Sequence, residues 1–304
     1  MDKLTLLTRR SPLAMWQTET VRDQLLAQHS KLSITLSAHS TGGDREQRVA
    51  LQDIGGKDLF ATDLRNQLQP GMAAVHSLKD LSVNAQPGLT LAAVLPRATE
   101  YDALVSRCGK LSELPQQARI GTASPRRRSQ LLAVRPDLDC RLIRGNVGTR
   151  LQKLDDGEFD AIILAACGLE RLGLGERITE LLDPKEFIPA IGQAVIGIEC
   201  LADDQATQGL LQSIHCERTH CCIIAERKFN QYLGGDCFSA IAAHAFLSEK
   251  GLSMRTYVGS LDGQTQLRAE RLNTHLKPEE LGLTLAQELE AQGARALLNP
   301  KQGG

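Results

Sequence analysis

The sequence has few aromatic residues, no excess of charge of either sign and no long apolar run. Aromatic residues make up only 3% of the 304 residues, so aliphatic side chains must supply the core. The 35 basic residues are matched by 36 acidic ones, and a formal net charge of −1 gives no global reason to expect nucleic acid or a membrane surface as a partner. Any basic binding site must therefore be local.

Signals for export and a disulfide framework are also missing. Residues 1–8 lack the charged start and apolar run of a secretory signal, and no stretch approaches the length that spans a membrane. The 8 cysteines are scattered through a large chain, which favours reduced thiols. We therefore expect a cytoplasmic protein.

Two kinds of passage occur twice along the chain. Ser11-Pro12 and Ser124-Pro125 each open a helical pattern after an apolar run, with serine suited to the N-cap and proline to the first helical position. Glycine-containing segments at 55–57 and 145–149 each open another helical stretch that leads into a strand. Strands that alternate with helices indicate parallel α/β sheets, so the repeat predicts two similar α/β domains.

The C-terminal part of the chain has a different pattern. A helical run at 223–232 precedes a glycine-rich loop, three strand-like runs and a closing helix at 281–298, which is typical of an α+β domain. The expected domains are residues 1–95 with 195–212, residues 100–188, and residues 217–304.

Arginines at predicted strand ends and helix starts carry the strongest functional signal. Guanidinium groups there face the crevice of a parallel sheet and can bind carboxylates or phosphates, and helix N-termini after Ser11 and Ser124 add unpaired N–H groups. The loop at 145–148 matches neither the nucleotide P-loop nor the dinucleotide fingerprint, so nucleotide binding is a poor explanation. The arginines are Arg9, Arg126, Arg127, Arg144, Arg150 and Arg171.

Two other residues are candidates for chemistry. Asp80 follows a predicted strand next to Lys79, where a carboxylate could stabilise a developing cation or accept N–H donors from a heterocycle. Cys237 lies in a glycine-rich loop, where an accessible thiol could form a covalent attachment. A turn aspartate and an incidental thiol remain the alternatives.

Six motifs together resemble the porphobilinogen deaminase family over nearly the full length of the chain. They are TRRSPLA at 8–14, GGK at 55–57, AVHSLKD at 74–80, GTAS at 121–124, LIRGNVGTRL at 142–151 and DAIILA at 160–165. The resemblance implies two domains like those of type II periplasmic binding proteins and a small α+β third domain. It also implies a monomer that condenses four molecules of the small-molecule substrate porphobilinogen to hydroxymethylbilane, in tetrapyrrole (haem) biosynthesis.

The resemblance further assigns roles to individual residues. It makes Asp80 the catalytic carboxylate and Cys237 the residue that carries a dipyrromethane cofactor through a thioether. The implied cofactor-binding residues are Lys79, Thr122, Ser124, Arg126, Arg127, Arg144 and Arg150. The implied substrate-binding residues are Arg9, Ser11, Lys57, Arg144, Arg150 and Arg171.

Several positions depart from the family pattern. Gly42 and Asp53 stand in a loop over the expected active site where basic residues are usual, and Asp236 replaces a glycine beside Cys237. Ser82 replaces a proline, Ala194 replaces a glycine, and residues 98–101 diverge near the expected hinge. These departures leave open a divergent paralogue of low activity.

Two other classes of function are kept open. A non-catalytic binding module for small polycarboxylates would use the same basic crevice, although Asp80 and Cys237 argue against it. A metal site could use the group His215, Cys216, His220, Cys221 and Cys222. We expect no metal there, because residues five apart do not share a helix face well.

Overall fold

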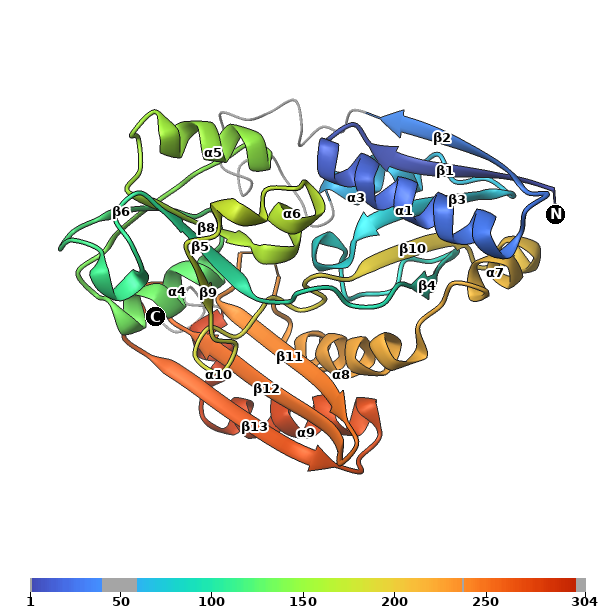
Figure 1. Ribbon diagram of the computed structural model, residues 1–304. Coiled ribbons are helices and arrows are strands. Elements are labelled where there is room, and N and C mark those ends of the chain that lie inside the picture. The colour runs from blue at the N-terminus through green and yellow to red at the C-terminus, as the bar shows by residue number, and fades with distance from the viewer. Residues whose placement is uncertain (1, 40–58, 237, 299–304) are drawn as a thin grey trace. The chain divides into compact units, whose positions relative to one another are not determined.

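The computed structural model describes residues 2–39, 59–236 and 238–298 (Figure 1). The chain divides into two compact units. Unit 1 comprises Met1–Ala98 and Ala194–His220, and unit 2 comprises Thr99–Gln193 and Cys221–Gly304. The chain therefore passes between the units three times. In the described ranges, no helix combines the length and apolar character needed to cross a bilayer.

Unit 1 is built on a five-stranded mixed sheet. Its strands are β1 (Lys3–Arg9), β2 (Ser33–His39), β3 (Met72–Ser77), β4 (Leu89–Val94) and β10 (Ile196–Leu201), in the order β2-β1-β3-β10-β4. β1 pairs in parallel with β2 and β3, whereas β10 runs antiparallel to both β3 and β4. The helical elements are α1 (Pro12–Gln28), α3 (Leu59–Arg65), the 3₁₀ turn η1 (Leu78–Asp80) and α7 (Gln205–Gln212).

Unit 2 contains a second five-stranded sheet with the same plan. Its strands are β5 (Asp102–Ser106), β6 (Arg119–Gly121), β7 (Asp139–Arg141), β8 (Ala161–Ala165) and β9 (Glu180–Leu182), in the order β7-β6-β8-β5-β9. β6 is parallel to β7 and β8, and β5 is antiparallel to β8 and β9. The helical elements are α4 (Pro125–Val134), α5 (Val147–Asp155), α6 (Ala166–Arg171), and the turns η2 (Leu111–Glu113) and η3 (Gly175–Arg177).

The repeat predicted from the sequence is present in both sheets. β1 with α1 corresponds to β6 with α4, and β3 with η1 corresponds to β8 with α6. In each sheet, one antiparallel strand interrupts the expected parallel pattern. These two strands, β10 and β5, follow directly where the chain has crossed from one unit to the other, so their direction is set by the crossing and not by a local βα unit.

Local sequence explains how α1 and α4 begin. Ser11 is extended (φ −65°, ψ 145°) and accepts a hydrogen bond from the Ala14 N–H, with Pro12 in the first turn. Ser124 likewise accepts from the Arg127 N–H ahead of Pro125. Both N-caps predicted from the sequence are confirmed.

The remaining part of unit 2 is an antiparallel sheet covered by helices. It comprises α8 (Glu217–Leu233) from Cys221 onward, β11 (Ile241–Ser248), β12 (Gly251–Gly259), β13 (Gln266–Thr274), α9 (Pro278–Ala291) and α10 (Ala294–Leu298). Phe229, Met254 and Leu285 meet in its core. The predicted closing helix is two helices, because Gly293 has φ +97° and ends the first. The segment before β11 that contains Cys237 joins α8 to this sheet.

Candidate active site

In unit 1, candidate residues gather at one edge of the sheet. Arg9 is the last residue of β1 and Ser11 caps the following helix, while Lys79 and Asp80 lie in η1 directly after β3. β1 and β3 are adjacent and parallel, so their carboxyl ends share an edge, which is where open α/β sheets bind ligands. The side chains of Lys79 and Asp80 are exposed there.

The start of the turn that carries Asp80 is tied to α1. Ser77 precedes η1, and its Oγ lies 2.9 Å from Nε2 and 3.1 Å from Oε1 of Gln17. Gln17 is buried, at 2% exposure. The amide of Gln17 thus fixes the end of β3 against the helix that Ser11 caps.

A buried ion pair lies one residue further back along β3. Arg65 donates from Nε (2.8 Å) and Nη2 (2.9 Å) to the carboxylate of Glu199, and His76 Nε2 lies 3.4 Å from Glu199 Oε2. Burial alone would raise the pKa of Glu199, but His76 and Arg65 outweigh it and lower the pKa to about 2. The pair joins α3 to β10 beneath the strand that leads to Asp80.

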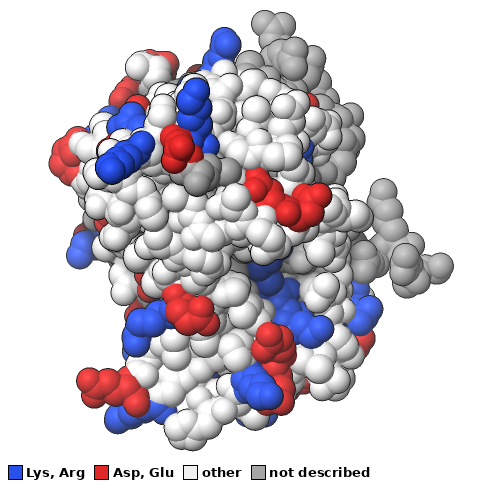
Figure 2. All heavy atoms as spheres, turned by 90° about the vertical axis from the view of Figure 1, so that its right-hand side faces the viewer, with Lys and Arg blue, Asp and Glu red and all other residues white. Residues whose placement is uncertain are grey.

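In unit 2, the candidate residues again follow parallel strands. Thr122, Ser124, Arg126 and Arg127 come after β6, Arg144 and Arg150 lie around the start of α5 after β7, and Arg171 ends α6 after β8. These three strands are adjacent and parallel. Figure 2 shows basic and acidic side chains interspersed over the face it presents, in keeping with a net charge near zero.

Arg126 and Arg127 are buried and share one carboxylate. Arg126 Nη1 donates to Asp102 Oδ2 (2.7 Å), and Arg127 donates to Oδ1 from Nη2 (2.7 Å) and Nε (3.1 Å). Gln193 Nε2 adds a fourth bond to Oδ1, at 2.9 Å. Burial would raise the pKa of Asp102, but the two guanidinium groups hold it well below its usual range. Two cations on one anion leave a positive charge in excess.

Sequence reasoning missed Asp102. It opens β5 just after the first crossing between the units, and no motif marks it. A lone aspartate ahead of the apolar run Ala103–Val105 was the available signal, because a charge at the start of a buried strand needs a buried partner.

The loop around Arg144 and Arg150 is fixed by its own backbone. Asn146 caps α5 by accepting from the Thr149 N–H (2.9 Å), and Arg150 Nε donates to the Gly145 carbonyl (2.8 Å). Gly145 has φ +112°, and a Cβ there would collide with Thr149. This position therefore requires glycine. Near the neighbouring strand end, burial lowers the pKa of Arg171.

Several expectations fall on residues outside the described ranges, namely Gly42, Asp53, Lys57 and Cys237. The residues on either side of Cys237 are described. Asp236 Oδ1 accepts hydrogen bonds from the Phe238 N–H (3.0 Å) and from Ser239 Oγ (2.8 Å). The aspartate that departs from the family glycine thus bonds to the two residues that follow the cysteine.

Three other departures have local explanations in the structure. Ala194 has φ +67°, in the left-handed region where an L-residue is strained, which accounts for a glycine at this place in the family. Ser82 Oγ accepts from the Asn84 N–H (3.2 Å) and so makes a turn of its own. Within the divergent stretch 98–101, the Glu100 carbonyl accepts a hydrogen bond from Gln193 Nε2 (2.7 Å) in unit 2.

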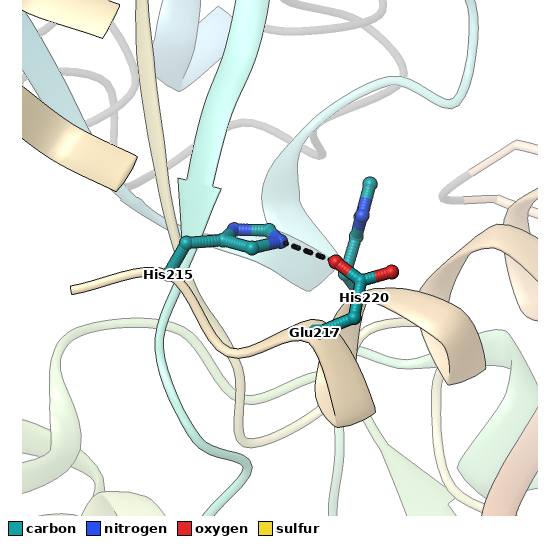
Figure 3. Close-up of side chains that lie close together, drawn as sticks. All are labelled: His215, Glu217 and His220. Carbon is teal, nitrogen blue, oxygen red and sulfur yellow. Dashed lines mark ion pairs between the residues drawn. The ribbon is translucent and has the colours of Figure 1, made fainter. Parts of the chain in front are cut away.

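A cluster of potential metal ligands lies at the start of α8 (Figure 3). The nearest ligand atoms of His215, Glu217 and His220 lie within 4.8 Å of one another. Glu217 and His220 are three apart on the first turn of the helix, and His215 precedes it, so the spacing argument against a shared face does not apply. Two imidazoles and a carboxylate are a donor set that zinc and similar ions accept.

The backbone around His215 nevertheless disfavours a metal on that ring. Nδ1 accepts a hydrogen bond from the Val94 N–H (3.2 Å), so the neutral ring carries its proton on Nε2, which points toward Glu217 at 3.4 Å. A metal bound at Nε2 would require the ring proton to sit on Nδ1, where it would face the N–H donor of Val94. The Val94 carbonyl also accepts from the Cys216 N–H (2.8 Å), and residues 215–216 thus cover the edge of β4.

Comparison with known proteins gives consistent matches along the chain. Residues 4–209 match the family model described as porphobilinogen deaminase, dipyromethane cofactor binding domain, and residues 220–291 match the porphobilinogen deaminase C-terminal domain. A porphobilinogen deaminase of Coxiella burnetii is 45% identical over 297 residues, covering 97% of this chain and 96% of its own length. One from Thiobacillus denitrificans is 43% identical over 302 residues, covering 98% of this chain and 99% of its own length.

The chain also resembles solved structures of low sequence identity. A Salmonella typhimurium periplasmic binding protein with arginine specificity has a TM-score of 0.39 at 10% identity, covering 70% of this chain and 92% of its own. A YaeC-family lipoprotein from Enterococcus faecalis has a TM-score of 0.40 at 13% identity, covering 72% of this chain and 93% of its own. The fold class, two α/β domains of the type II periplasmic-binding-protein kind and a small α+β domain, agrees with the three sheets of the structure.

Proposed function

The chain belongs to the porphobilinogen deaminase family, and from this premise we propose that it condenses four porphobilinogen molecules head to tail into hydroxymethylbilane with release of ammonia. This is a transferase reaction that forms carbon–carbon bonds. The observation that carries the proposal is the repeated placement of cationic side chains at the carboxyl ends of parallel strands, with the carboxylate of Asp80 at the same edge as Arg9.

Dipyrromethane is the cofactor of the matched family domain. The residues of unit 2 fit a ligand of this kind, because Arg126 and Arg127 share a single carboxylate and keep positive charge in a buried setting. The N-terminus of α4, capped by Ser124, lies in the same turn and favours anions. When bound, the cofactor supplies the nucleophilic pyrrole carbon from which the product chain is built.

We assign the chain's own residues the following roles. Asp80 accepts pyrrole N–H donors and stabilises the positive charge that develops on the substrate as ammonia leaves. Cys237 holds the cofactor covalently. Lys79, Thr122, Ser124, Arg126, Arg127, Arg144 and Arg150 bind cofactor carboxylates, and Arg9, Ser11, Lys57, Arg144, Arg150 and Arg171 bind those of the substrate.

The proposal includes a cytoplasmic monomer. No disulfide bond joins two cysteines among the described residues, and reduced cysteines are what a reducing compartment favours. Size-exclusion chromatography with light scattering would test the monomer.

Intact-protein mass spectrometry of the purified chain, with and without porphobilinogen, tests the function. We expect two linked pyrroles on the peptide that contains Cys237, and growth by single pyrrole units with substrate. Asp80→Ala should abolish turnover and leave the fold intact, and Cys237→Ser should prevent cofactor attachment. The control Asp23→Ala, which removes an exposed carboxylate, should retain both turnover and attachment. Normal bilane formation by the Asp80 or Cys237 variant would refute the roles assigned to these two residues.

A further inference from the structure

Helix α4 is joined to the C-terminal sheet of unit 2 through Ser129. Ser129 Oγ donates to the Ser260 carbonyl (2.5 Å) and lies 2.6 Å from the Tyr257 hydroxyl. Because the single Ser129 proton goes to Ser260, the Tyr257 hydroxyl is the donor in the second bond. Ser129 and Tyr257 are both fully buried. The two bonds therefore form one short chain from the end of β12 to α4, and the bond between the two hydroxyls is buried.

The same end of β12 also reaches the base of the loop that contains Cys237. The Gly259 N–H donates to the Ala240 carbonyl (2.9 Å), three residues after the cysteine. A Cβ at Gly259 would collide with the hydroxyls of Tyr257 and Ser129, so the close approach requires glycine at this position. Two consecutive residues, Gly259 and Ser260, thus bond to the loop base and to α4.

The turn of α4 that precedes Ser129 holds the paired arginines. Arg126 Nη1, already bonded to Asp102, also donates to the Ile188 carbonyl (2.8 Å). Gln130 clamps Ile188 from both sides, accepting from its N–H (2.7 Å) and donating to its carbonyl (3.1 Å). The side chain of Ile188 packs against Tyr257. The guanidinium groups and the Tyr257 ring are therefore parts of one packed cluster.

A further contact holds Tyr257 in place. The Arg268 guanidinium lies over the Tyr257 ring, 5.1 Å from its centroid, and donates to the carbonyls of Lys185 (3.1 Å) and Glu186 (2.8 Å). The ring is thus fixed independently of its hydroxyl, and removing the hydroxyl alone should leave the packing intact.

We propose that Ser129 and Tyr257 are positioning residues for the cofactor, because their hydrogen bond holds the base of the loop that contains Cys237 in fixed register with Arg126 and Arg127. The inference rests on the proposed function. A ligand fixed covalently at one end can bring its carboxylates to two immobile guanidinium groups only if the distance between anchor and cations is set in advance. The register matters most during cofactor attachment, before the ligand itself holds the two sites together.

The test is the rate at which the full-length, cofactor-free chain, made in cells unable to synthesise porphobilinogen, gains pyrrole mass when porphobilinogen is added. Tyr257→Phe and Ser129→Ala should each slow the gain by about tenfold, the factor expected from one buried hydrogen bond. The double variant should be no slower than the slower single variant, because both changes break one link. Tyr232→Phe is the matched control, since it removes the Tyr232–Glu290 hydrogen bond on another face of the same domain.

Thermal unfolding of the same proteins separates positioning from stability. Slow attachment in the Tyr257 and Ser129 variants, with the control attaching at the wild-type rate despite a similar change in Tm, would support the inference. Attachment at the wild-type rate in Tyr257→Phe, or a rate that follows Tm across all variants including the control, would overturn it while leaving the proposed function in place. A wild-type chain that never gains pyrrole mass would overturn both.

Discussion

Replacing Asp102 by Asn would test the buried cluster in unit 2. The carboxylate accepts bonds from Arg126, Arg127 and Gln193, and its side chain is 1% exposed. Asn has nearly the same shape but one acceptor oxygen and no charge. Whichever way the amide turns, its NH₂ group faces a guanidinium donor now about 2.7 Å away, and two buried cations lose their counter-ion.

The expected cost follows from that geometry. Breaking a buried ion pair by removing one partner costs ~3–5 kcal/mol, because a charge is left without compensation in the interior. We therefore expect Asp102→Asn to lower the free energy of unfolding at pH 7 by about 3–5 kcal/mol, measured by urea denaturation. Asp155→Asn, which breaks an exposed pair with Arg177 (2.7 Å), should cost less than about 1 kcal/mol.

The pH dependence gives a second check on the same pair of proteins. The pKa of Asp102 is lowered in the folded state, so its contribution is complete above the unfolded value of about 4 and is lost as the pH falls below it. The difference in the free energy of unfolding between wild type and Asp102→Asn should stay constant from pH 8 to about pH 5 and become smaller in more acidic solution. If the free energy of unfolding of Asp102→Asn lies within about 1 kcal/mol of the wild-type value at pH 7, the counter-ion role of Asp102 in the buried cluster is refuted.

Three further predictions concern unit 1. Glu199→Gln should lower the free energy of unfolding at pH 7 by roughly 3 kcal/mol, and the loss should shrink as the pH falls from about 4.5 toward the folded pKa of about 2. Ala194→Gly should raise the free energy of unfolding by up to ~1 kcal/mol, because glycine adopts φ +67° without strain. Zn²⁺ should change the Tm of wild type and of His220→Ala equally, because the proton on His215 Nε2 keeps the metal from that ring.

Each of these predictions has a result that contradicts it. For Glu199, the control is Glu270→Gln, which breaks the exposed pair with Arg255. An equal loss of unfolding free energy in the two variants would refute the larger contribution assigned to the buried pair of Glu199. If Ala194→Gly lowers the free energy of unfolding by more than about 1 kcal/mol, packing of the methyl group outweighs the backbone strain. A Zn²⁺-dependent rise in Tm that disappears in His220→Ala would show that His215 changes tautomer and binds the metal.

Most of the candidate residues are marked by local sequence, and this is why their places at strand ends and helix starts could be predicted without a structure. Ser11 and Ser124 precede prolines after apolar runs, and the capping geometry depends only on the next three residues. Asp80 follows β3 immediately, so its place at the strand end is set by a single turn. The internal repeat was visible for the same reason, because each copy is a short strand–turn–helix passage.

Residues that act through contacts distant in sequence were missed. Asp102 meets Arg126 and Arg127 across 24 and 25 positions of the chain, and Ser129 meets Tyr257 across 128. Neither pair has a motif, because the partners come together only when the sheets pack. Helix spacing alone argues against a metal site, yet His215 lies before the helix and is fixed by a strand residue 121 positions earlier.

The sequence by itself thus determined the helix starts, the strand ends, the internal repeat and the candidate residues that sit on them, because short-range geometry decides each of these. Only the tertiary structure decided which charges are buried together, why Ala194 is strained, and which antiparallel strand completes each sheet. Those features depend on segments that the chain brings together after crossing between the units, and no local pattern of residues specifies them.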